Sequence, residues 1–295
     1  MRDGIFIQID ITDWLNRLID KLVVNYGDSL REVSAVLLRF LLVPLESFLL
    51  WLHPGVVLLA TAIIAWYGFR SIKMVIICLA LMYLIGAFGL WEKYMQTLSI
   101  MTVSIAITIL IGIPMGIVLA RVGWLGKIFR PILDGMQTFP MFVYMLPAVM
   151  LFSIGKVPAV MATVIYSLPP LVRLTELGIV QVDREIKEAA TSFGASKWQL
   201  LRWVFLPLAR PSIMAGINQT TMMALAMVVV ASMIGARGLG EDILYGITNL
   251  DFGRGVKAGI SIVIIAFIID RITQAYGVTA RIREMKREIP NIEEG

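Results

Sequence analysis

The sequence predicts an all-α integral membrane protein with about seven transmembrane helices and an eighth as the alternative. Of its 295 residues, 58% are hydrophobic and only 16% are charged, whereas a soluble domain is nearer half apolar and a quarter charged. The mean hydropathy is +0.83. The apolar residues gather in stretches of about 20, the length that a helix needs to cross the hydrocarbon core of a bilayer.

The first 53 residues are expected to form an amphipathic extension that lies on the external surface of the membrane. Residues 5–24 mix apolar residues with acids and bases, as a helix in the membrane interface does. Residues 30–52 are more apolar, but charged side chains interrupt them, and an arginine at mid-membrane costs about 2.5–3.5 kcal/mol on insertion scales. We therefore favour a surface helix for 30–52 over an eighth crossing. The interrupting residues are Arg31, Glu32, Arg39 and Glu46.

Seven apolar stretches follow the extension, and each is long enough to cross a bilayer. The fourth is the shortest, and Pro147 interrupts it. In the third, Gly112 and Gly116 are four residues apart, a spacing that permits close contact with another helix. The stretches are roughly 54–70, 72–91, 97–120, 139–155, 157–177, 211–234 and 255–276.

The distribution of lysine and arginine predicts the orientation. One set of loops is richer in these residues and is therefore expected to be cytoplasmic. This places the loop at 178–210 and the C-terminus inside, and with seven crossings the N-terminus lies outside. The richer set holds Arg70, Lys73, Arg121, Lys127, Arg130, Arg184, Lys187, Lys197, Arg202, Arg210, Arg281, Arg283, Lys286 and Arg287, and the poorer set holds Lys93, Lys156, Arg237, Arg254 and Lys257.

The composition argues against several classes of function. The net charge of +5 is spread through short loops and the C-terminal tail, so we expect a membrane orientation signal and no nucleic-acid partner. Cys78 and His53 are the sole cysteine and histidine, which predicts no metal site and no disulfide. The sequence has no G-x-x-x-x-G-K-[ST] motif. We therefore expect no catalytic residue and no ATP hydrolysis by this chain itself.

One stretch, EAATSFGASKWQLLRWVFLPLARP, interrupts the apolar pattern between the fifth and sixth crossings. Asp183 is suited to cap a short helix that Gly194 then ends. Ser196 and Gln199 have the spacing of a capping box for a second helix over 197–205. Two prolines follow. We expect Pro207 to stop that second helix and Pro211 to open the next crossing.

This loop resembles the EAA loop of permease subunits of bacterial ABC importers. The family pattern is Glu-Ala-Ala, three residues, Gly, nine residues, then Ile-x-Leu-Pro, and the only departure is Val204 in place of Ile. In that family the loop is a coupling helix that docks on the ATP-binding subunit. The residues to which the resemblance assigns this role are Glu188, Ala189, Ala190, Gly194, Ala195, Leu206 and Pro207.

The resemblance extends over about 90–276 and is closest to the glycine betaine/proline betaine importer permeases. The segments that carry it are MQTFPMFVYMLPAVMLFSIGKVPAV, YSLPPLVRLTELGI, INQTTMMALAMVVVASMIGARGLG and IIAFIIDRITQA. It implies a type I ABC importer permease fold in the bacterial cytoplasmic membrane. The implied partners are a second permease copy, two copies of an ATP-binding subunit that holds ATP and Mg, and an extracytoplasmic substrate-binding protein.

On this interpretation the chain has four parts. Residues 1–53 form the extension, and 54–91 form two peripheral helices. Residues 92–276 form the core permease domain with its cytoplasmic loop at 181–210, and 277–295 form a basic cytoplasmic tail.

Two groups of residues are candidates for the solute pathway. A quaternary ammonium is best met by aromatic faces, and Phe142, Tyr144 and Met145 lie in a proline-bearing segment of the kind in which transporters place solute sites. Asn218 and Gln219 are polar within the sixth crossing and are expected to face the bundle interior. Packing between helices is the stronger explanation for the first group, and hydrogen bonding between helices is favoured over a pathway role for the second. For Arg173 and Glu176, three residues apart, we expect a solvated ion pair.

Two other classes of function remain open at this level. An ion-gradient-driven secondary transporter is expected to carry buried acidic ligands and an internal repeat, and neither stands out. A membrane scaffold explains the hydropathy but not the register of the EAA pattern. A third alternative is an ABC permease for another small amino-acid-like solute.

Overall fold

Every regular element in the described part of the chain is a helix. The structure, a computed structural model, describes residues 12–288. The long helices are α1 (Thr12–Val36), α2 (Val43–Trp51), α3 (Pro54–Phe69), α4 (Ile72–Ala87), α5 (Trp91–Arg121), α6 (Gly123–Thr138), α7 (Met141–Phe152), α8 (Lys156–Val180), α9 (Arg184–Ser192), α11 (Leu206–Ala231), α12 (Leu239–Thr248) and α13 (Phe252–Glu288). Short segments complete the chain: α10 (Lys197–Gln199), wide π-helical turns at Leu37–Leu42 and Leu200–Phe205, and a 3-10 turn at Ser232–Ile234.

Helix α8 forms the centre of the bundle, and small residues let its neighbours approach it. A Cβ added to Gly116 of α5 would lie 2.6 Å from Cβ of Thr175 in α8. Three residues further along α8, a Cβ added to Gly178 would lie 2.7 Å from Cβ of Ser212 in α11. The close contact that the glycine spacing predicts on α5 is therefore confirmed, and the helix that it meets is α8.

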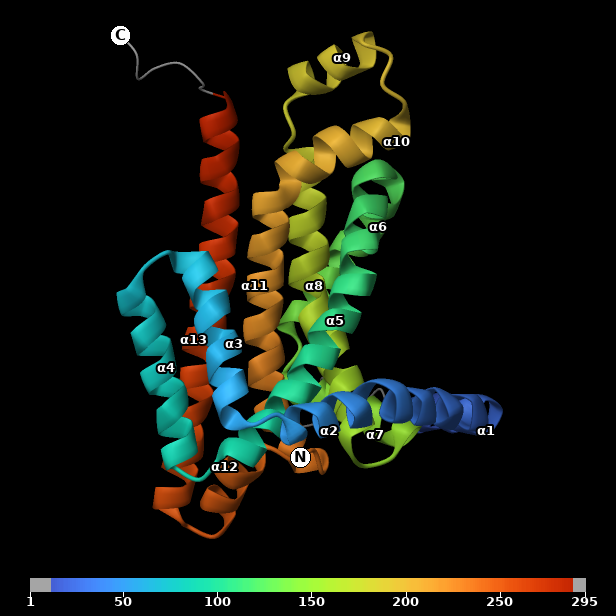
Figure 1. Cartoon of the computed structure of the whole chain (residues 1–295). Coiled ribbons are helices and arrows are strands. Elements are labelled where there is room, and N and C mark those ends of the chain that lie inside the picture. Colours follow the sequence, from blue (N-terminus) through green and yellow to red (C-terminus); the bar gives the residue numbers. More distant parts are fainter. Residues whose placement is uncertain (1–11, 289–295) are drawn as a thin grey trace, which may run out of the picture.

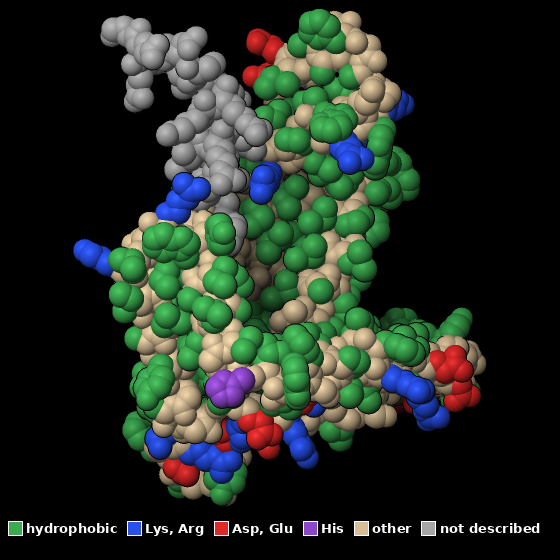
Figure 2. Space-filling view, viewed as in Figure 1, with side chains coloured by type: hydrophobic (Ala, Val, Ile, Leu, Met, Phe, Trp, Pro, Cys, Tyr) green, Lys and Arg blue, Asp and Glu red, His purple; other side chains and the backbone are tan. Residues whose placement is uncertain are grey.

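The ends of the bundle differ in character. In Figure 1, α9 and α10 lie at one end, which we call the inner end, together with the C-terminal end of the described part of α13. Helices α7 and α12 lie at the opposite, outer end. Figure 2 shows hydrophobic side chains over the middle of the visible face and charged side chains gathered toward its ends. This is the pattern of a protein whose middle lies in lipid.

The predicted fourth crossing at 139–155 is wrong in its extent. The chain instead forms a bent pair, in which α6 and α7 meet at an angle of 100°. Phe139 is extended, with φ −67° and ψ 135°, because a residue that precedes a proline is disfavoured in the helical conformation. Helix α7 has 12 residues, about 18 Å, which is too short to cross a bilayer alone.

The number of crossings stays a prediction. Among the described residues, five helices are long and apolar enough to cross a membrane, or up to six if the bent pair counts as one span. Helices α3 and α4 are apolar but have only 16 residues each. The five include the segment Thr12–Trp51.

The N-terminal extension lies across the bundle and not along it. In Figure 1, α1 and α2 run crosswise at the outer end, near α7. Glu46 of α2 is buried and pairs with the Lys156 ammonium at the start of α8. The segment ends at Trp51, close to the predicted boundary at 53, and its crosswise placement agrees with a helix on the membrane surface. Residues 1–11 of the predicted extension lie outside the described part, as do 289–295 of the predicted tail.

Candidate functional site

The loop between α8 and α11 has the local structure that its sequence predicts. The Asp183 carboxylate accepts a hydrogen bond from the backbone N–H of Glu185 at 3.0 Å and so caps α9. Arg184 donates to Glu188 one turn later at 2.7 Å. The Ser196 hydroxyl and the Gln199 side chain form a reciprocal capping box at the start of α10. The bonds from Asp183, Ser196 and Gln199 satisfy backbone N–H groups that the start of a helix leaves free, whereas the Arg184–Glu188 pair joins two side chains.

Gly194 ends α9 in a left-handed conformation, with φ +81°. Its N–H bonds to the carbonyl of Thr191 at 2.9 Å, and the next N–H, that of Ala195, bonds to the carbonyl of Ala190 at 3.1 Å. This pair of bonds is the Schellman motif, which requires a residue with positive φ at this position. Glycine adopts that conformation without the steric penalty of a Cβ atom.

The predicted stop at Pro207 is wrong. Residues Lys197–Ile234 form one continuous helical run, in which the π-helical turn Leu200–Phe205 passes directly into α11 and Pro207 lies in the first turn of α11. The N–H of Leu206 bonds to the carbonyl of Leu201, five residues back. We attribute the continuity to this wider turn, because it shifts the hydrogen-bond register just where Pro207 lacks a donor. Pro211 lies inside α11 and does not open it.

Most of the loop's surface is free in this chain. No residue of α9 is buried. Glu188, Ala189 and Pro207 are exposed, whereas Ala190, Ala195 and Leu206 are half-buried. Three large aromatic side chains also project from the loop, Phe193 at 93% exposure, Trp198 at 64% and Trp203 at 71%. An exposed apolar surface of this kind at the end of a bundle is typical of an interaction site.

The three predicted pathway residues of α7 do not share one face. Tyr144 and Met145 are buried in a small cluster with Ala162 of α8 and Met227 of α11. The Tyr144 hydroxyl donates to the carbonyl of Met136. Phe142 is exposed on another side of α7. In this arrangement Tyr144 and Met145 pack helices together.

Asn218 and Gln219 of α11 likewise do not share one face of their helix. The Asn218 amide donates to a carboxylate oxygen of Asp270 in α13 at 3.0 Å. Its own oxygen is buried and has no hydrogen-bond partner among the described residues. Gln219 is exposed. Asn218 therefore faces the bundle interior as expected, and Gln219 does not.

Two ion pairs join α6 to α8, and neither was among the expected contacts. Glu176, only 4% exposed, accepts from Arg130 at 2.7 and 3.0 Å. Arg173 pairs with Asp134. The expected pair between Arg173 and Glu176 is therefore wrong, because each residue has its partner on the neighbouring helix. The four-residue spacing of Arg130 and Asp134 on α6, which matches the opposite charges on α8, is the signal that was available.

A third charged cluster lies at the outer end and was also missed. Asp242 of α12 is buried and accepts from Lys93 of α5 at 2.5 Å and from Arg254 of α13 at 2.6 Å. The Arg254 guanidinium also lies 3.9 Å from the centre of the Tyr245 ring. One carboxylate thus ties three helices together. The described residues hold no group of three potential metal ligands.

Comparison with known proteins gives a consistent result. Residues 112–277 match the family described as binding-protein-dependent transport system inner membrane component. The glycine betaine/proline betaine transport system permease protein ProW of Escherichia coli (strain K12) is 45% identical over 279 residues, which cover 95% of this chain and 78% of that protein. The glycine betaine transport system permease protein OpuAB of Bacillus subtilis (strain 168) is 40% identical over 280 residues, with 94% and 97% covered.

A solved structure shows the same fold. An inward facing conformation of the MetNI methionine ABC transporter matches with a TM-score of 0.58 and 21% sequence identity, over 68% of this chain and 97% of that chain. The predicted all-α, type I importer permease fold is therefore confirmed.

Proposed function

The chain belongs to the family of binding-protein-dependent transport system inner membrane components, and we propose that its solute is a quaternary ammonium osmoprotectant of the glycine betaine/proline betaine class. The observation that carries the solute class is the similarity to ProW and OpuAB, whose names give glycine betaine as the transported compound and which match over nearly the whole chain. The chain is the membrane permease subunit of an ABC importer.

The coupling site in this proposal is the α9–α10 loop. Ala189 and Ala190 add little bulk to α9, so the helix can sit deep in a groove of an ATP-binding subunit, while the exposed Phe193, Trp198 and Trp203 supply apolar contact area. The Schellman motif at Gly194 fixes the angle between α9 and α10. The loop therefore offers a preformed surface to its partner.

The continuous helix explains how a movement of the loop would reach the membrane. Because Lys197–Ile234 is a single helical run, a displacement of α10 carries the inner end of α11 with it. Helix α8, which leads into the loop from the other side, packs tightly against α11 at Gly178. Closure of two ATPase subunits would thus move α8 and α11 together and open the pathway outward.

The assembly follows from the family. It would comprise two copies of this permease, two ATP-binding subunits that hold ATP and Mg, and an external binding protein that delivers the solute. The inner end faces the cytoplasm, and the N-terminal extension lies outside. Phe142, Tyr144, Met145, Asn218 and Gln219 stay as pathway candidates. For the buried Tyr144 and Met145 this role requires that α7 move away from α8 and α11.

Uptake of radiolabelled glycine betaine by vesicles tests the proposal. The vesicles hold this chain with its ATP-binding subunit and binding protein, and ATP is present or absent inside. We expect uptake only with ATP, and competition by proline betaine. Uptake without ATP that follows an ion gradient would contradict an importer, and ATP-driven uptake of another amino-acid-like solute without betaine would contradict the solute class.

A further inference from the structure

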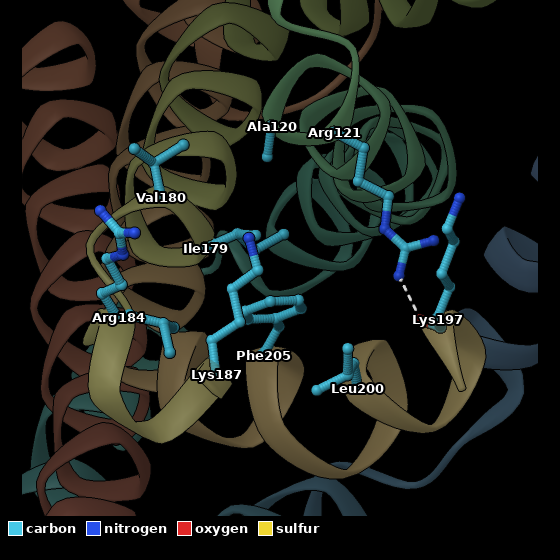
Figure 3. A pocket seen from close by; sticks show the side chains of 10 residues that line it. Ala120, Arg121, Ile179, Val180, Arg184, Lys187, Lys197, Leu200 and Phe205 are labelled. Carbon is cyan, nitrogen blue, oxygen red and sulfur yellow. Dashed lines mark hydrogen bonds between the residues drawn. The ribbon is translucent and has the colours of Figure 1, made fainter. Parts of the chain in front are cut away.

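A pocket of about 690 Å³ lies between the α9–α10 loop and the inner ends of α5 and α8. Figure 3 shows Arg121 and Lys197 on one side of it and Arg184 on the other, with Lys187 between them beside Phe205. The lining residues come from four separate stretches of the chain. They are Ala120, Arg121, Ile179, Val180, Val182, Arg184, Lys187, Lys197, Leu200 and Phe205.

The charge of this pocket is strongly one-sided. Four of its ten lining residues are lysine or arginine, and none is acidic. Arg184 pairs with Glu188 on the exposed face of α9, and Arg121 donates to the backbone carbonyl of Lys197 at 2.8 Å. Among the described residues, the ammonium groups of Lys187 and Lys197 have no acidic partner.

Such a group of like charges is stabilised by an anion. The neighbouring cations repel one another, and a bound anion offsets this repulsion because it attracts each of them. Phosphate suits the set best, because arginine and lysine both bind its oxygens through charge-assisted hydrogen bonds. The lysine and arginine side chains of the pocket can therefore serve as the ligands of a phosphate group.

The remaining lining residues indicate where the phosphate comes from. Ala120, Ile179, Val180, Leu200 and Phe205 give the pocket an apolar wall. Ala120 and Val180 lie at the ends of α5 and α8, two candidate membrane spans, so the pocket lies at the level where lipid headgroups meet the acyl region. A phospholipid offers a phosphate and an apolar chain at that depth, whereas a free anion offers only the charge.

We propose that this pocket binds the phosphate of an anionic phospholipid, held by Arg121, Lys187 and Lys197. The bound headgroup joins Lys187 of α9 and Lys197 of α10 to Arg121 of α5, and so fixes the loop relative to the bundle. This site is separate from the solute pathway. It requires neither the ATP-binding subunit nor a solute, so its failure would leave the proposed transport function untouched.

Lipid retention by the purified full chain tests the proposal. The chain is placed in nanodiscs of phosphatidylcholine that contain a trace of spin-labelled phosphatidylglycerol, and the immobilised fraction is compared with that of labelled phosphatidylcholine. We expect the native chain to prefer phosphatidylglycerol. The double substitution Lys187→Gln with Lys197→Gln should lower that preference about fivefold or more, since each lysine near an anionic lipid contributes appreciably to binding.

The matched control is Lys73→Gln with Lys127→Gln, which removes two exposed charges that do not line the pocket. This control should keep the native preference. Melting curves of both double variants verify folding, and either single pocket variant replaces a double variant that unfolds.

Three results would overturn the proposal. The first is an equal preference in the two double variants. The second is displacement of the labelled phosphatidylglycerol by millimolar inorganic phosphate, which would identify a free anion as the occupant. The third is that the native chain shows no preference for phosphatidylglycerol, while the pocket variant no longer co-purifies with the ATP-binding subunit. That result would assign the pocket to an acidic segment of that partner.

Discussion

Gly194 determines the backbone conformation of the α9–α10 loop, because its positive φ makes both hydrogen bonds of the Schellman motif possible. No atom lies within 4 Å of the position where a Cβ would be added, so the effect of a substitution comes from backbone conformation and not from crowding. An L-residue with a Cβ in the left-handed region costs about 1–2 kcal/mol, and asparagine tolerates that region better than most residues.

We predict that Gly194→Ala weakens binding of the ATP-binding subunit by about 5- to 30-fold, and that Gly194→Asn weakens it less. Co-purification of the subunit at graded concentrations measures this. Equal binding by the alanine and asparagine variants would show that the backbone conformation of Gly194 is not what the partner recognises.

Glu176 is a buried carboxylate whose partner, Arg130, lies on another helix. Removal of the arginine leaves the buried charge without its main hydrogen-bond donor. We predict that Arg130→Met lowers the free energy of unfolding by about 1–3 kcal/mol. Thermal unfolding of the detergent-solubilised chain measures the effect.

The matched control for this prediction is Arg31→Met, which breaks the exposed pair with Asp28. An exposed ion pair contributes about 0–1 kcal/mol, so this control should change the melting temperature little. A similar shift in both variants would mean that the Arg130–Glu176 pair does not hold α6 against α8.

At the scale of elements, the sequence predicted local features well and pairings poorly. The Asp183 cap, the Gly194 end and the Ser196–Gln199 capping box depend on residues within a few positions, and all are confirmed. The partners of Arg173 and Glu176 depend on which helix lies opposite α8, and periodicity along one helix does not contain that information.

The two errors on helix ends have local causes of a different kind. Helices α6 and α7 meet at a sharp bend because Phe139, which precedes Pro140, is extended, and the Phe139–Pro140 pair is itself a sequence signal for a helix end. Pro207 does not stop its helix because the π-helical turn precedes it, and no simple residue pattern announces such a turn.

The contact between α5 and α8 gives a sharp test at this scale. A Cβ at Gly116 would lie 2.7 Å from the backbone carbonyl oxygen of Val172, which cannot turn aside as a side chain can. Gly135, inside α6, has open space around it. We predict that Gly116→Ala destabilises the protein by about 1–3 kcal/mol, whereas Gly135→Ala is neutral or slightly stabilising because alanine favours helix.

Melting temperatures of the two variants provide the comparison. The same chemical change at both sites removes the intrinsic preference of alanine as an explanation. A Gly116→Ala variant as stable as Gly135→Ala would contradict the close packing of α5 on α8.

At the scale of the whole molecule, the distribution of lysine and arginine predicts which end is cytoplasmic. Single cysteines at the exposed Asp20, Ser192 and Asn249, in a Cys78→Ala background, test the orientation with a maleimide that does not cross membranes. We predict labelling of Asp20→Cys and Asn249→Cys in intact spheroplasts, and of Ser192→Cys only after permeabilisation. Labelling of Ser192→Cys from outside would reverse the orientation.

The most direct test of the central claim, that the α9–α10 loop couples the permease to an ATPase, is to measure ATP hydrolysis and glycine betaine uptake together. Vesicles that hold the native complex are compared with vesicles that hold an assembled Gly194→Asp complex. We predict ATP-dependent uptake by the native complex and its loss in the variant while the ATP-binding subunit stays bound. Native rates of uptake in the assembled variant, or uptake by the native chain without ATP, would contradict the claim.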